Sequence, residues 1–482
     1  MQDTCPNDRN ARIDLAVKAT QPSPNAGIVL AAASIAAAIC GGLYGYDTGI
    51  ISGALLSMTS EFHLDHQMQE IVAAAILAGA VIGALLSSWS SERFGRKHTI
   101  LAVAALFAVG AVACGLAPTV DVLIITRIVL GMAVGASTQV VPMYISELAP
   151  HDRRGTLVTV FNVAIGAGIV FANIIGFGLH EVWTWRSMVM VAAIPAGIVF
   201  TVMLFMPYSP RWIAEKQGLF EAAQTLQKVR SSHGEIRHEL TQIDDIERTV
   251  KSDAMGWRGI TQPWVRPALV AALGVAFFTQ CGGLEMMIYY SPTFLLNAGF
   301  GRNAALLSSV GVALVYALVT LAGCLLIDRI GRRRLMLVMI PGSVLSLIGL
   351  GIMFALDTHG GLGGIMTILC LLLFMMFNSG GIQICGWLLG AELFPLEMRG
   401  PATALHAATL WGSNLVVTGT ALSVVNAVGL GVTMWIYASI NFLSFIFVFF
   451  FVPETAGASL EDIENALRNK KFSKEFNIKQ IP

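Results

Sequence analysis

Two charged residues lie in stretches that are otherwise almost wholly apolar. Asp47 is in the first such stretch, and Arg127 is near the start of the fourth. A charge inside hydrocarbon is costly, so both residues are expected to be paired or to line water. One interpretation is a fixed ion pair that joins two helices. The other is a carboxylate that exchanges a proton, because an ionisable group within a membrane is functional by default.

A second group of polar residues lies in the seventh apolar stretch, between Thr279 and Tyr290. Gly282 and Gly283 permit a broken helix, which would expose backbone polar groups to a ligand in the middle of the membrane. Glu285 follows the two glycines directly, and its side chain only accepts hydrogen bonds when it is ionised.

A short polar motif occurs twice, as Glu92-Arg93-Phe94-Gly95-Arg96-Lys97 and as Asp328-Arg329-Ile330-Gly331-Arg332-Arg333-Arg334. Each copy separates two apolar stretches, and its glycine can adopt backbone angles that a side chain would forbid. The motif predicts a tight hairpin between membrane helices. Its recurrence indicates two related halves.

The composition places these motifs in an integral membrane protein. Of the 482 residues, 55% are hydrophobic and 12% are charged, and the mean hydropathy is +0.70; soluble domains carry about 25% charged residues. The net charge is zero, and no basic patch with interleaved aromatic residues suggests nucleic acid. The seven cysteines have no metal-ligand spacing, and no cofactor is expected.

A membrane-spanning helix needs about 20 apolar residues. Twelve stretches meet this length, near residues 27–51, 70–91, 98–116, 121–142, 157–178, 186–206, 267–295, 304–327, 335–356, 364–391, 401–425 and 431–452. We therefore expect an all-α fold of twelve transmembrane helices in two pseudo-symmetric six-helix bundles.

Basic residues are concentrated in alternate loops, so the positive-inside rule places both chain ends in the cytoplasm. The loops on the other side hold only Arg186 and Arg302. The expected organisation is a cytoplasmic tail (1–26), a first bundle (27–206), a helical cytoplasmic linker (207–266), a second bundle (267–452) and a second tail (453–482). Two related halves around a central cavity are typical of a transporter.

The chain resembles the sugar porter branch of the major facilitator superfamily, and most closely its bacterial proton-linked sugar symporters. The resemblance extends from about Gly41 to Glu464. It rests on motifs that occur together and in the family's order: Gly45-Tyr46-Asp47, the two hairpins, Pro142-x-Tyr144-x-x-Glu147 with Arg154-Gly155, Ser209-Pro210-Arg211-Trp212, Gln280 to Tyr290, Glu392-Leu393-Phe394-Pro395 with Arg399-Gly400, and Pro453-Glu454-Thr455 with Gly457.

The resemblance implies that Asp47 binds the co-transported proton and that Arg127 tunes it, because passive carriers of the family have a neutral residue in place of the acid. It also implies a central solute site with an aromatic floor. The residues expected to contact the solute are Tyr44, Asn162, Thr279, Gln280, Glu285, Trp387, Trp411 and Asn414. Amides, hydroxyls and aromatic rings suit a polyhydroxylated ring, whose faces are apolar and whose edges form hydrogen bonds.

Several of these positions depart from the family. Thr279 stands where the family has glutamine, Glu285 where it has asparagine, and Asn162 and Leu410 where it has other residues. Glu285 could bind solute hydroxyls, pair with a cationic amino-sugar, serve as a second proton site, or be a protonated acid that bonds a neighbouring helix. The two tryptophans could instead be packing residues. We interpret the lone His406 as a packing residue.

A third group lies at the cytoplasmic ends of the helices. By resemblance, Glu147, Arg154, Glu392 and Arg399 cross-link the two halves when the cavity opens outward. The residues expected to act in cytoplasmic gating are Glu92, Arg93, Arg96, Glu147, Arg154, Asp328, Arg332, Glu392 and Arg399. The alternative is a set of solvated surface pairs worth under about 1 kcal/mol each. Tyr208 replaces the family's glutamate before Ser209-Pro210-Arg211, which removes one cytoplasmic acid.

The function that these features predict is proton-coupled symport of a sugar or polyol across the plasma membrane, most plausibly of a bacterium, by a monomer. An uncoupled carrier for a sugar, inositol or amino-sugar is the alternative, and a channel and a sugar sensor without transport belong to other classes. No stretch matches the phosphate loop of an ATP-driven pump, and no triad of a hydrolase is present. The identity of the solute stays open.

Overall fold

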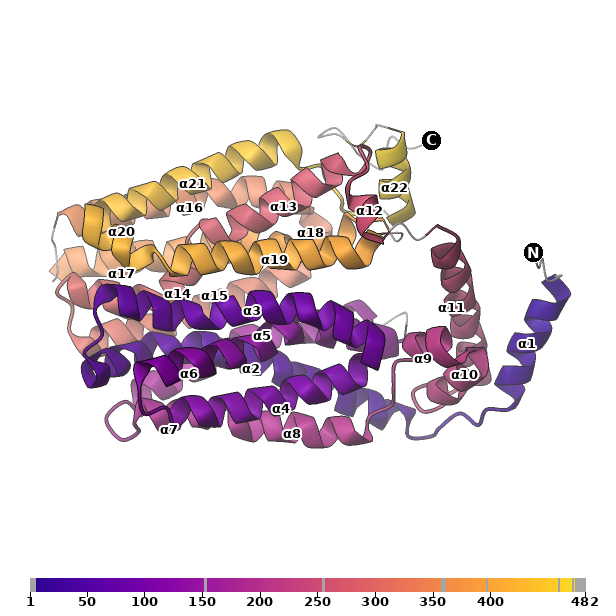
Figure 1. Cartoon of the computed structure of the whole chain (residues 1–482). Coiled ribbons are helices and arrows are strands. Elements are labelled where there is room, and N and C mark those ends of the chain that lie inside the picture. The colour runs from indigo at the N-terminus through magenta and orange to yellow at the C-terminus, as the bar shows by residue number, and fades with distance from the viewer. Residues whose placement is uncertain are drawn as a thin grey trace.

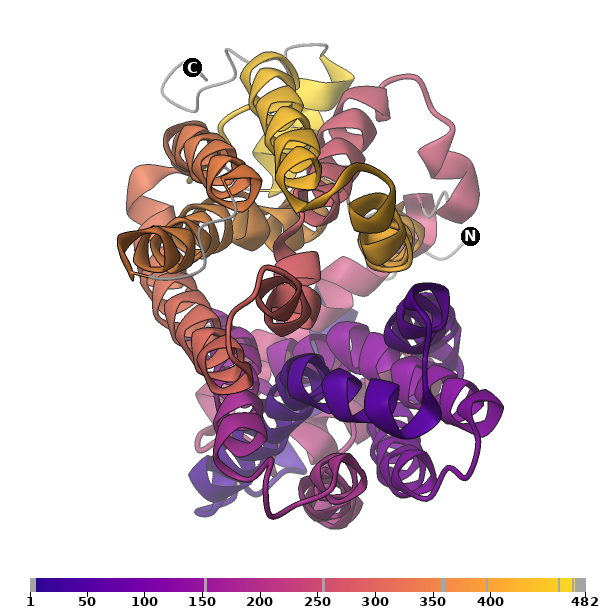
Figure 2. The ribbon, with the colours of Figure 1, turned by 90° about the vertical axis from the view of Figure 1, so that its left-hand side faces the viewer.

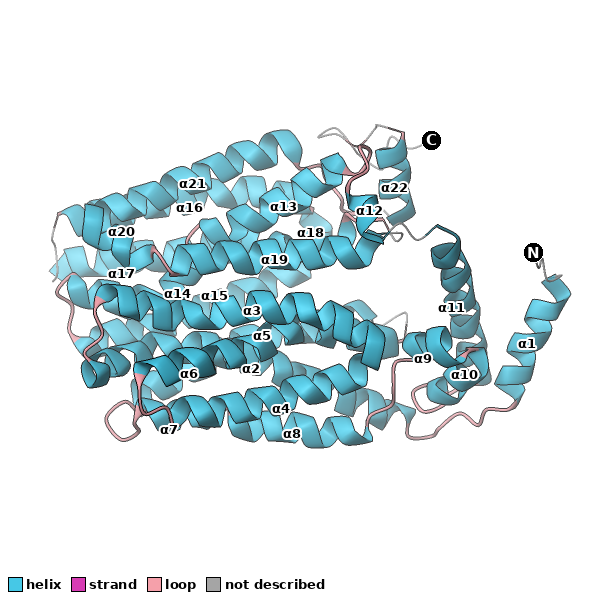
Figure 3. Ribbon diagram, in the orientation of Figure 1, coloured by secondary structure: helices cyan, strands magenta, loops and turns pink. Residues whose placement is uncertain are grey.

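The computed structural model describes residues 6–150, 154–253, 256–356, 361–395, 398–457, 460–469 and 472. Within these ranges all regular elements are helices (Figure 3). Twelve helical segments there are long and apolar enough to cross a membrane. The predicted all-α membrane fold is confirmed.

The six spanning segments of the first half form the lower part of the molecule in Figure 1. They are α2 (Ala26–Phe62), α3 (His66–Phe94), α4 (Arg96–Gly115), α5 (Val120–Leu148), α6 (Arg154–Gly178) and the pair α7 (Trp185–Met190) and α8 (Ala193–Phe205). The first spanning helix continues beyond the predicted end at residue 51 and ends at Phe62. Its last turn, after Met58, is more polar than the rest of the helix.

The second half lies above the first, and the view along the bundles in Figure 2 separates the two by colour. Its helices are α13 (Arg266–Cys281) with α14 (Leu284–Asn297), α15 (Arg302–Ile330), α16 (Arg332–Ala355), α17 (Gly361–Asn378), α18 (Ile384–Glu392), α19 (Arg399–Thr418) with α20 (Ala421–Val428), and α21 (Leu430–Phe451). A π-helical turn, Ser379–Gln383, joins α17 to α18.

Short polar helices gather at one end of the bundles, which we call the linker end; the opposite end is called the far end (Figure 1). They are α9 (Pro210–Gln217), α10 (Leu219–Leu226), α11 (His233–Asp253), α12 (Gly256–Ile260) and α22 (Leu460–Arg468). The N-terminal segment also contains a helix, α1 (Pro6–Lys18), which packs against α10 and α11. An ion pair of 3.0 Å between Asp14 and Arg237 fixes it there.

Both hairpin motifs turn at the linker end with the predicted glycine geometry. Gly95 has φ 86° and Gly331 has φ 95°, values that favour glycine. Each glycine ends one spanning helix and precedes the next, α3 and α4 in the first half and α15 and α16 in the second.

Glycines also bring helices of the first bundle into close contact. A Cβ atom at Gly45 would lie 1.9 Å from the Ile165 carbonyl oxygen, and one at Gly131 would lie 1.9 Å from that of Ile76. Small residues at such crossings allow backbones to approach closely, which drives helix association where no hydrophobic effect operates. This packing fixes α2, which carries Asp47, against α6. It likewise fixes α5, which carries Arg127, against α3.

The largest contacts between the two bundles are those of two helix pairs, α3 with α19 and α6 with α15; α2 also meets α14, and α3 also meets α20. Between α6 and α15, a Cβ atom added to Gly166 would lie 3.0 Å from the Ala317 Cα atom. These surfaces are where one bundle would have to move over the other.

Candidate functional site

Asp47 and Arg127 are both buried, on α2 and α5, with exposed fractions of 4% and 0%. The Arg127 charge acts on the Asp47 carboxylate, yet no ion pair joins the two side chains. The Arg127 Nε atom donates instead to the Val72 carbonyl oxygen at 2.7 Å, and Nη1 and Nη2 have no hydrogen-bond partner among the described residues. The described side chains of Asp47 and Arg127 therefore do not form the ion pair that was one of the two interpretations of the sequence.

The seventh spanning segment is broken at Gly282 and Gly283, as the sequence predicts. α13 ends at Cys281, Gly283 has φ 89°, and α14 starts at Leu284. Glu285 therefore lies in the first turn of α14, where the free N–H groups of a helix favour negative charge. The break is held by Asn441 of α21, whose side chain donates to the Gly282 carbonyl oxygen at 2.9 Å.

Glu285 is 3% exposed and has no cation as a partner in the described part of the chain. Its charge acts on the hydroxyls of three tyrosines, Tyr44, Tyr289 and Tyr316. The Asp47 charge also acts on Tyr289, so this tyrosine is influenced by both buried acids. Tyr44 was among the predicted solute residues, whereas Tyr289 and Tyr316 were not. The doublet Tyr289-Tyr290 inside the family motif was the available signal for the first of them.

Three aromatic residues form a row that crosses from one bundle to the other. The ring of Tyr44 on α2 meets that of Trp411 on α19 edge to face, with centroids 5.5 Å apart. Trp411 in turn meets Trp387 on α18 at 6.0 Å. Such a row can present an apolar surface to the face of a sugar ring.

Polar atoms without a protein partner lie on α13, in the π-helical turn and on α19. They are Gln280 Oε1, Gln383 Oε1 and Trp411 Nε1, each buried and without a hydrogen bond within the described residues. Buried polar atoms are normally paired, so these two acceptors and one donor are available to a solute. Gln383 lies in the π-helical turn beside Tyr316 and was not among the predicted site residues. A π-helical turn is frequent at functional sites.

The remaining predicted solute residues have different surroundings. Asn414 is 2% exposed and accepts a 2.9 Å hydrogen bond from the Thr418 hydroxyl. Asn162 is half-buried on α6. Thr279 is fully buried, and its hydroxyl donates to the carbonyl oxygens of Val275 at 2.7 Å and Ile382 at 3.2 Å. The Thr279 side chain thus joins α13 to the π-helical turn.

Two matching clusters of ionic and hydroxyl groups lie at the linker end, one in each half. In the first, the Arg96 Nη2 atom is 2.9 Å from Glu147 Oε1, and the Ser209 hydroxyl donates to the other carboxylate oxygen. In the second, Arg332 pairs with Glu392 at 2.8 Å, and the Thr455 hydroxyl donates to that carboxylate at 3.2 Å. Each hairpin arginine thus binds an acid of its own half.

Further gating residues lie around these clusters. Asp328 pairs with Arg332 at 2.8 Å. Glu92 approaches the other half, since a Cβ atom on Gly400 would be 3.7 Å from its Oε1 atom. Arg154 and Arg399 begin α6 and α19, and their side chains lie outside the described residues.

The two linker-end clusters differ at one position. Glu454 accepts hydrogen bonds from the backbone N–H groups of Arg332 and Arg334 at 2.8 and 3.3 Å, which caps the start of α16. Tyr208 stands at the corresponding place in the first half. Its ring lies 5.0 Å from the Lys97 ammonium group and 6.2 Å from the Trp212 ring. The start of α4 therefore has an aromatic neighbour in place of a carboxylate cap.

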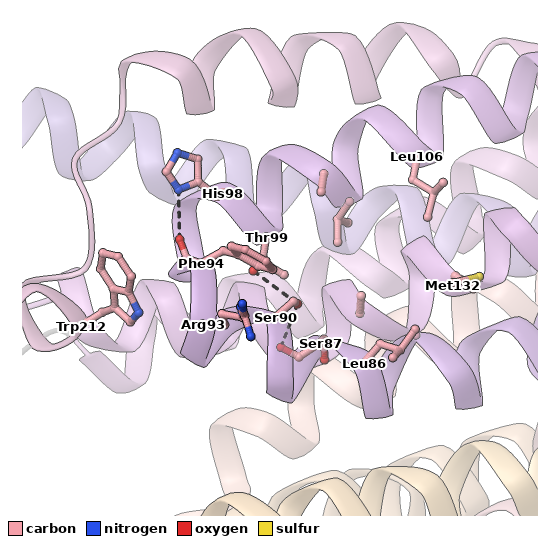
Figure 4. A pocket seen from close by; sticks show the side chains of 14 residues that line it. Leu86, Ser87, Ser90, Arg93, Phe94, His98, Thr99, Leu106, Met132 and Trp212 are labelled. Atoms are coloured by element: carbon pink, nitrogen blue, oxygen red, sulfur yellow. Dashed lines mark hydrogen bonds between the residues drawn. The ribbon is translucent and has the colours of Figure 1, made fainter. Parts of the chain in front are cut away.

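A separate cavity of about 820 Å³ lies between α3, α4 and α5 and is also lined by Trp212 of α9 (Figure 4). Arg93 lines it, and the guanidinium group is 5.7 Å from the ring centres of Trp89 and Phe94. The cavity holds none of the predicted solute residues, and its walls belong to the first bundle and the linker. It is therefore not a passage between the bundles.

Comparisons with known proteins agree with this geometry. A family model described as "Sugar (and other) transporter" matches residues 33–467. The putative metabolite transport protein YwtG of Bacillus subtilis is 39% identical over 433 residues, which cover 90% of this chain and 94% of the relative. The D-xylose transporter of Levilactobacillus brevis is 35% identical over 434 residues, with coverages of 90% and 94%.

The solved structures to which the chain is similar are also those of transporters. The partially occluded inward-open conformation of the xylose transporter XylE from E. coli is similar with a TM-score of 0.78 and 25% identity, over 89% of this chain and 99% of that one. The proton:xylose symporter XylE bound to 6-bromo-6-deoxy-D-glucose has a TM-score of 0.77 and 25% identity, over 92% and 99%.

Proposed function

Because this chain belongs to the sugar (and other) transporter family, the sugar porters of the major facilitator superfamily, we propose that it carries a sugar or polyol together with a proton. The protein is a membrane transporter and not an enzyme. The two bundles would expose the solute site to each side of the membrane in turn. The observation that carries the proposal is the buried Asp47, which faces Arg127 without an ion pair.

The proton step follows from the charges of these two residues. Ionised Asp47 attracts Arg127 across the gap between α2 and α5. Protonation removes that attraction and also the cost of keeping a charge in a dry environment. The neutral site permits the bundles to change orientation with the proton and the solute on board.

The solute would bind where the aromatic row, the α13–α14 break and the unpaired polar atoms come together. The ring face would pack on Trp387, Trp411 and Tyr44, and its hydroxyls would bond to Gln280 and Asn414. Support comes from the contact of Tyr44 with Trp411, which is made across the two bundles. Glu285 supplies an acceptor that the resembled sugar porters lack, so it is the residue that we expect to set solute selectivity.

The linker end would face the cytoplasm, because the basic hairpins and the linker lie there. We place the protein in the inner membrane of a bacterium as a multi-pass monomer. The relatives named above are bacterial.

The test uses purified protein in liposomes with an imposed pH difference. We expect sugar or polyol to accumulate on the alkaline side. Asp47→Asn should abolish accumulation and keep counterflow exchange, because the variant binds solute but carries no exchangeable proton. Glu61→Gln is the matched control, since Glu61 lies on the same helix but pairs with Arg186 at 2.6 Å. It should accumulate solute as the wild type does.

Two results would overturn the proposal in different ways. Full accumulation by Asp47→Asn would remove Asp47 as the proton site and favour another acid. Saturable equilibration without accumulation by the wild type would indicate an uncoupled carrier, and solute binding without any movement would indicate a sensor. A thermal-shift screen against sugars, polyols and amino-sugars would select the solute for these assays, because a ligand stabilises the folded state that binds it.

A further inference from the structure

Glu70 is a buried acid to which neither the motifs nor the solute site give a role. It lies in the second turn of α3 in the first bundle, near the far end, and is 3% exposed. Both of its carboxylate oxygens accept hydrogen bonds from one residue of the second bundle. The backbone N–H of Ser423 donates to Oε1 at 2.6 Å, and the Ser423 hydroxyl donates to Oε2 at 2.6 Å.

Ser423 is the third residue of α20, which begins at Ala421. The first N–H groups of a helix have no partner within it and need a cap. Thr420, the residue before α20, does not supply one, because its hydroxyl donates back to the Val416 carbonyl oxygen at 2.7 Å. Glu70 therefore caps this helix from the opposite bundle, and charge-assisted bonds of this kind are among the stronger hydrogen bonds in proteins.

The surroundings of Glu70 fix the same break between α19 and α20. The Tyr290 hydroxyl of α14 donates to the carbonyl oxygen of Thr418, the last residue of α19, at 2.9 Å. A Cβ atom on Gly419 would lie 3.4 Å from the Ala74 Cβ atom of α3. A second bond between the bundles runs from Arg302, at the start of α15, to the Ser57 hydroxyl of α2 at 3.2 Å.

Glu70 makes a contact between the halves that the described ion pairs of Arg96 and Arg332 do not make. At the linker end the ion pairs of Arg96 and Arg332 stay within one half. At the far end Glu70 joins the halves. For the far end to open, α20 must leave Glu70, and water must then hydrate both the carboxylate and the exposed N–H groups.

We propose that Glu70 is a gating residue for the transport reaction, a latch that holds the far end closed by capping α20 across the two bundles. Opening exchanges its two protein bonds for bonds to water, so the latch releases reversibly and lies outside the solute site. The inference depends on the alternating access proposed above, to which it adds a residue at the end opposite the known motifs.

The experiment measures the separation of the bundles at the far end by electron paramagnetic resonance. Spin labels at Val182 and Leu362, which are 77% and 71% exposed in different bundles, are placed in protein without native cysteines. Glu70→Ala should enlarge the population with the longer separation several-fold. Ser423→Ala should give a smaller shift, because its backbone N–H remains. The double variant should equal Glu70→Ala alone, since both changes remove one contact.

Glu61→Gln is again the control, because Glu61 lies near the same end and binds only Trp185 and Arg186 of its own bundle. It should leave the distances unchanged. Glu70→Gln keeps the shape of the side chain and removes one acceptor, and it should move the distances in the same direction as Glu70→Ala.

Distances that stay at their wild-type values in Glu70→Gln and Glu70→Ala would overturn the inference, as would a double variant that shifts further than Glu70→Ala. The labels report bundle separation without any solute. A failure to transport sugars in liposomes would therefore count against the proposed function only. The distances between the spin labels would still show whether Glu70 holds the far end closed.

Discussion

Three buried acids, Asp47, Glu285 and Glu70, are equally hidden from solvent but have different partners. Asp47 faces a cation, Glu70 caps a helix of the other bundle, and Glu285 has tyrosines around it and no cation among the described side chains. The cost of burying a carboxylate depends on what compensates it. The partners, not the burial, are therefore the reason for which we propose proton exchange for Asp47, gating for Glu70 and solute selection for Glu285.

Glu285→Asn should change which solutes are carried. The amide donates as well as accepts, and it loses the negative charge, so hydroxyl partners of the carboxylate would be bound less well. A site built to bond a particular group discriminates strongly against its absence. We expect the ratio of kcat/KM for the preferred solute to that for a close analogue to fall about tenfold or more, the effect of roughly 1.4 kcal/mol.

The measurement is uptake of paired labelled solutes, with Asn162→Ala as a comparison on the opposite bundle. Unchanged ratios and affinities in Glu285→Asn would remove Glu285 from the solute site.

At the scale of single elements, the two hairpins show how related halves can diverge. Glu454 caps α16, whereas Tyr208 packs on Lys97 and Trp212 beside the start of α4. The uncapped N–H groups of α4 must find other partners or water. The first bundle has thus exchanged a polar helix cap for an aromatic cluster that attaches the linker.

Tyr208→Glu should test this exchange. A glutamate there would reach the backbone N–H groups at the start of α4, as Glu454 does at α16, and would stabilise the helix by about 1 kcal/mol. The loss of the ring contacts with Lys97 and Trp212 acts in the opposite direction. We expect the apparent Tm to change by less than about 4 °C.

Glu454→Gln provides the reciprocal measurement by the same thermal scan, and it should lower Tm because it weakens an existing cap. A larger loss of Tm in Tyr208→Glu than in Glu454→Gln would show that the aromatic cluster, and not the cap, stabilises the first hairpin.

At the scale of the whole molecule, the proposed alternating access would require the bundles to move over each other where α6 meets α15, and small residues make this contact. At Gly166 of α6 the backbone of α15 is too near for a side chain, since a Cβ atom would lie within 3.1 Å of both Ala317 Cα and Ala317 Cβ. Two helices in a close contact between small residues can move along each other. A larger side chain inserted into this contact has no space and would force the bundles apart.

Gly166→Leu should reduce the maximal rate of transport by about tenfold or more, and by more than it weakens solute binding, because an added side chain hinders the movement of the bundles. Counterflow rates and equilibrium binding give the two quantities.

Gly178→Leu on the same helix is the control, since a Cβ atom there meets nothing within 4 Å. Equal losses of rate and binding in Gly166→Leu, or the same loss of rate in Gly178→Leu, would contradict a sliding contact at this position.

The sequence alone determined the properties that depend on neighbours along the chain. Twelve apolar stretches gave twelve spanning segments, Gly95 and Gly331 gave the two hairpins, and Gly282-Gly283 gave the break before Glu285. Each follows from local chemistry: the length needed to cross a bilayer, and the backbone angles open to glycine.

Only the tertiary structure decided which distant residues meet. Nothing near Glu70 or Ser423 in the sequence announces that they bond across 353 positions, nor that Tyr44 meets Trp411. The reason is that a helix shows its own apolar length in its sequence, whereas the rotation and depth at which it meets another helix depend on packing by small residues throughout both bundles.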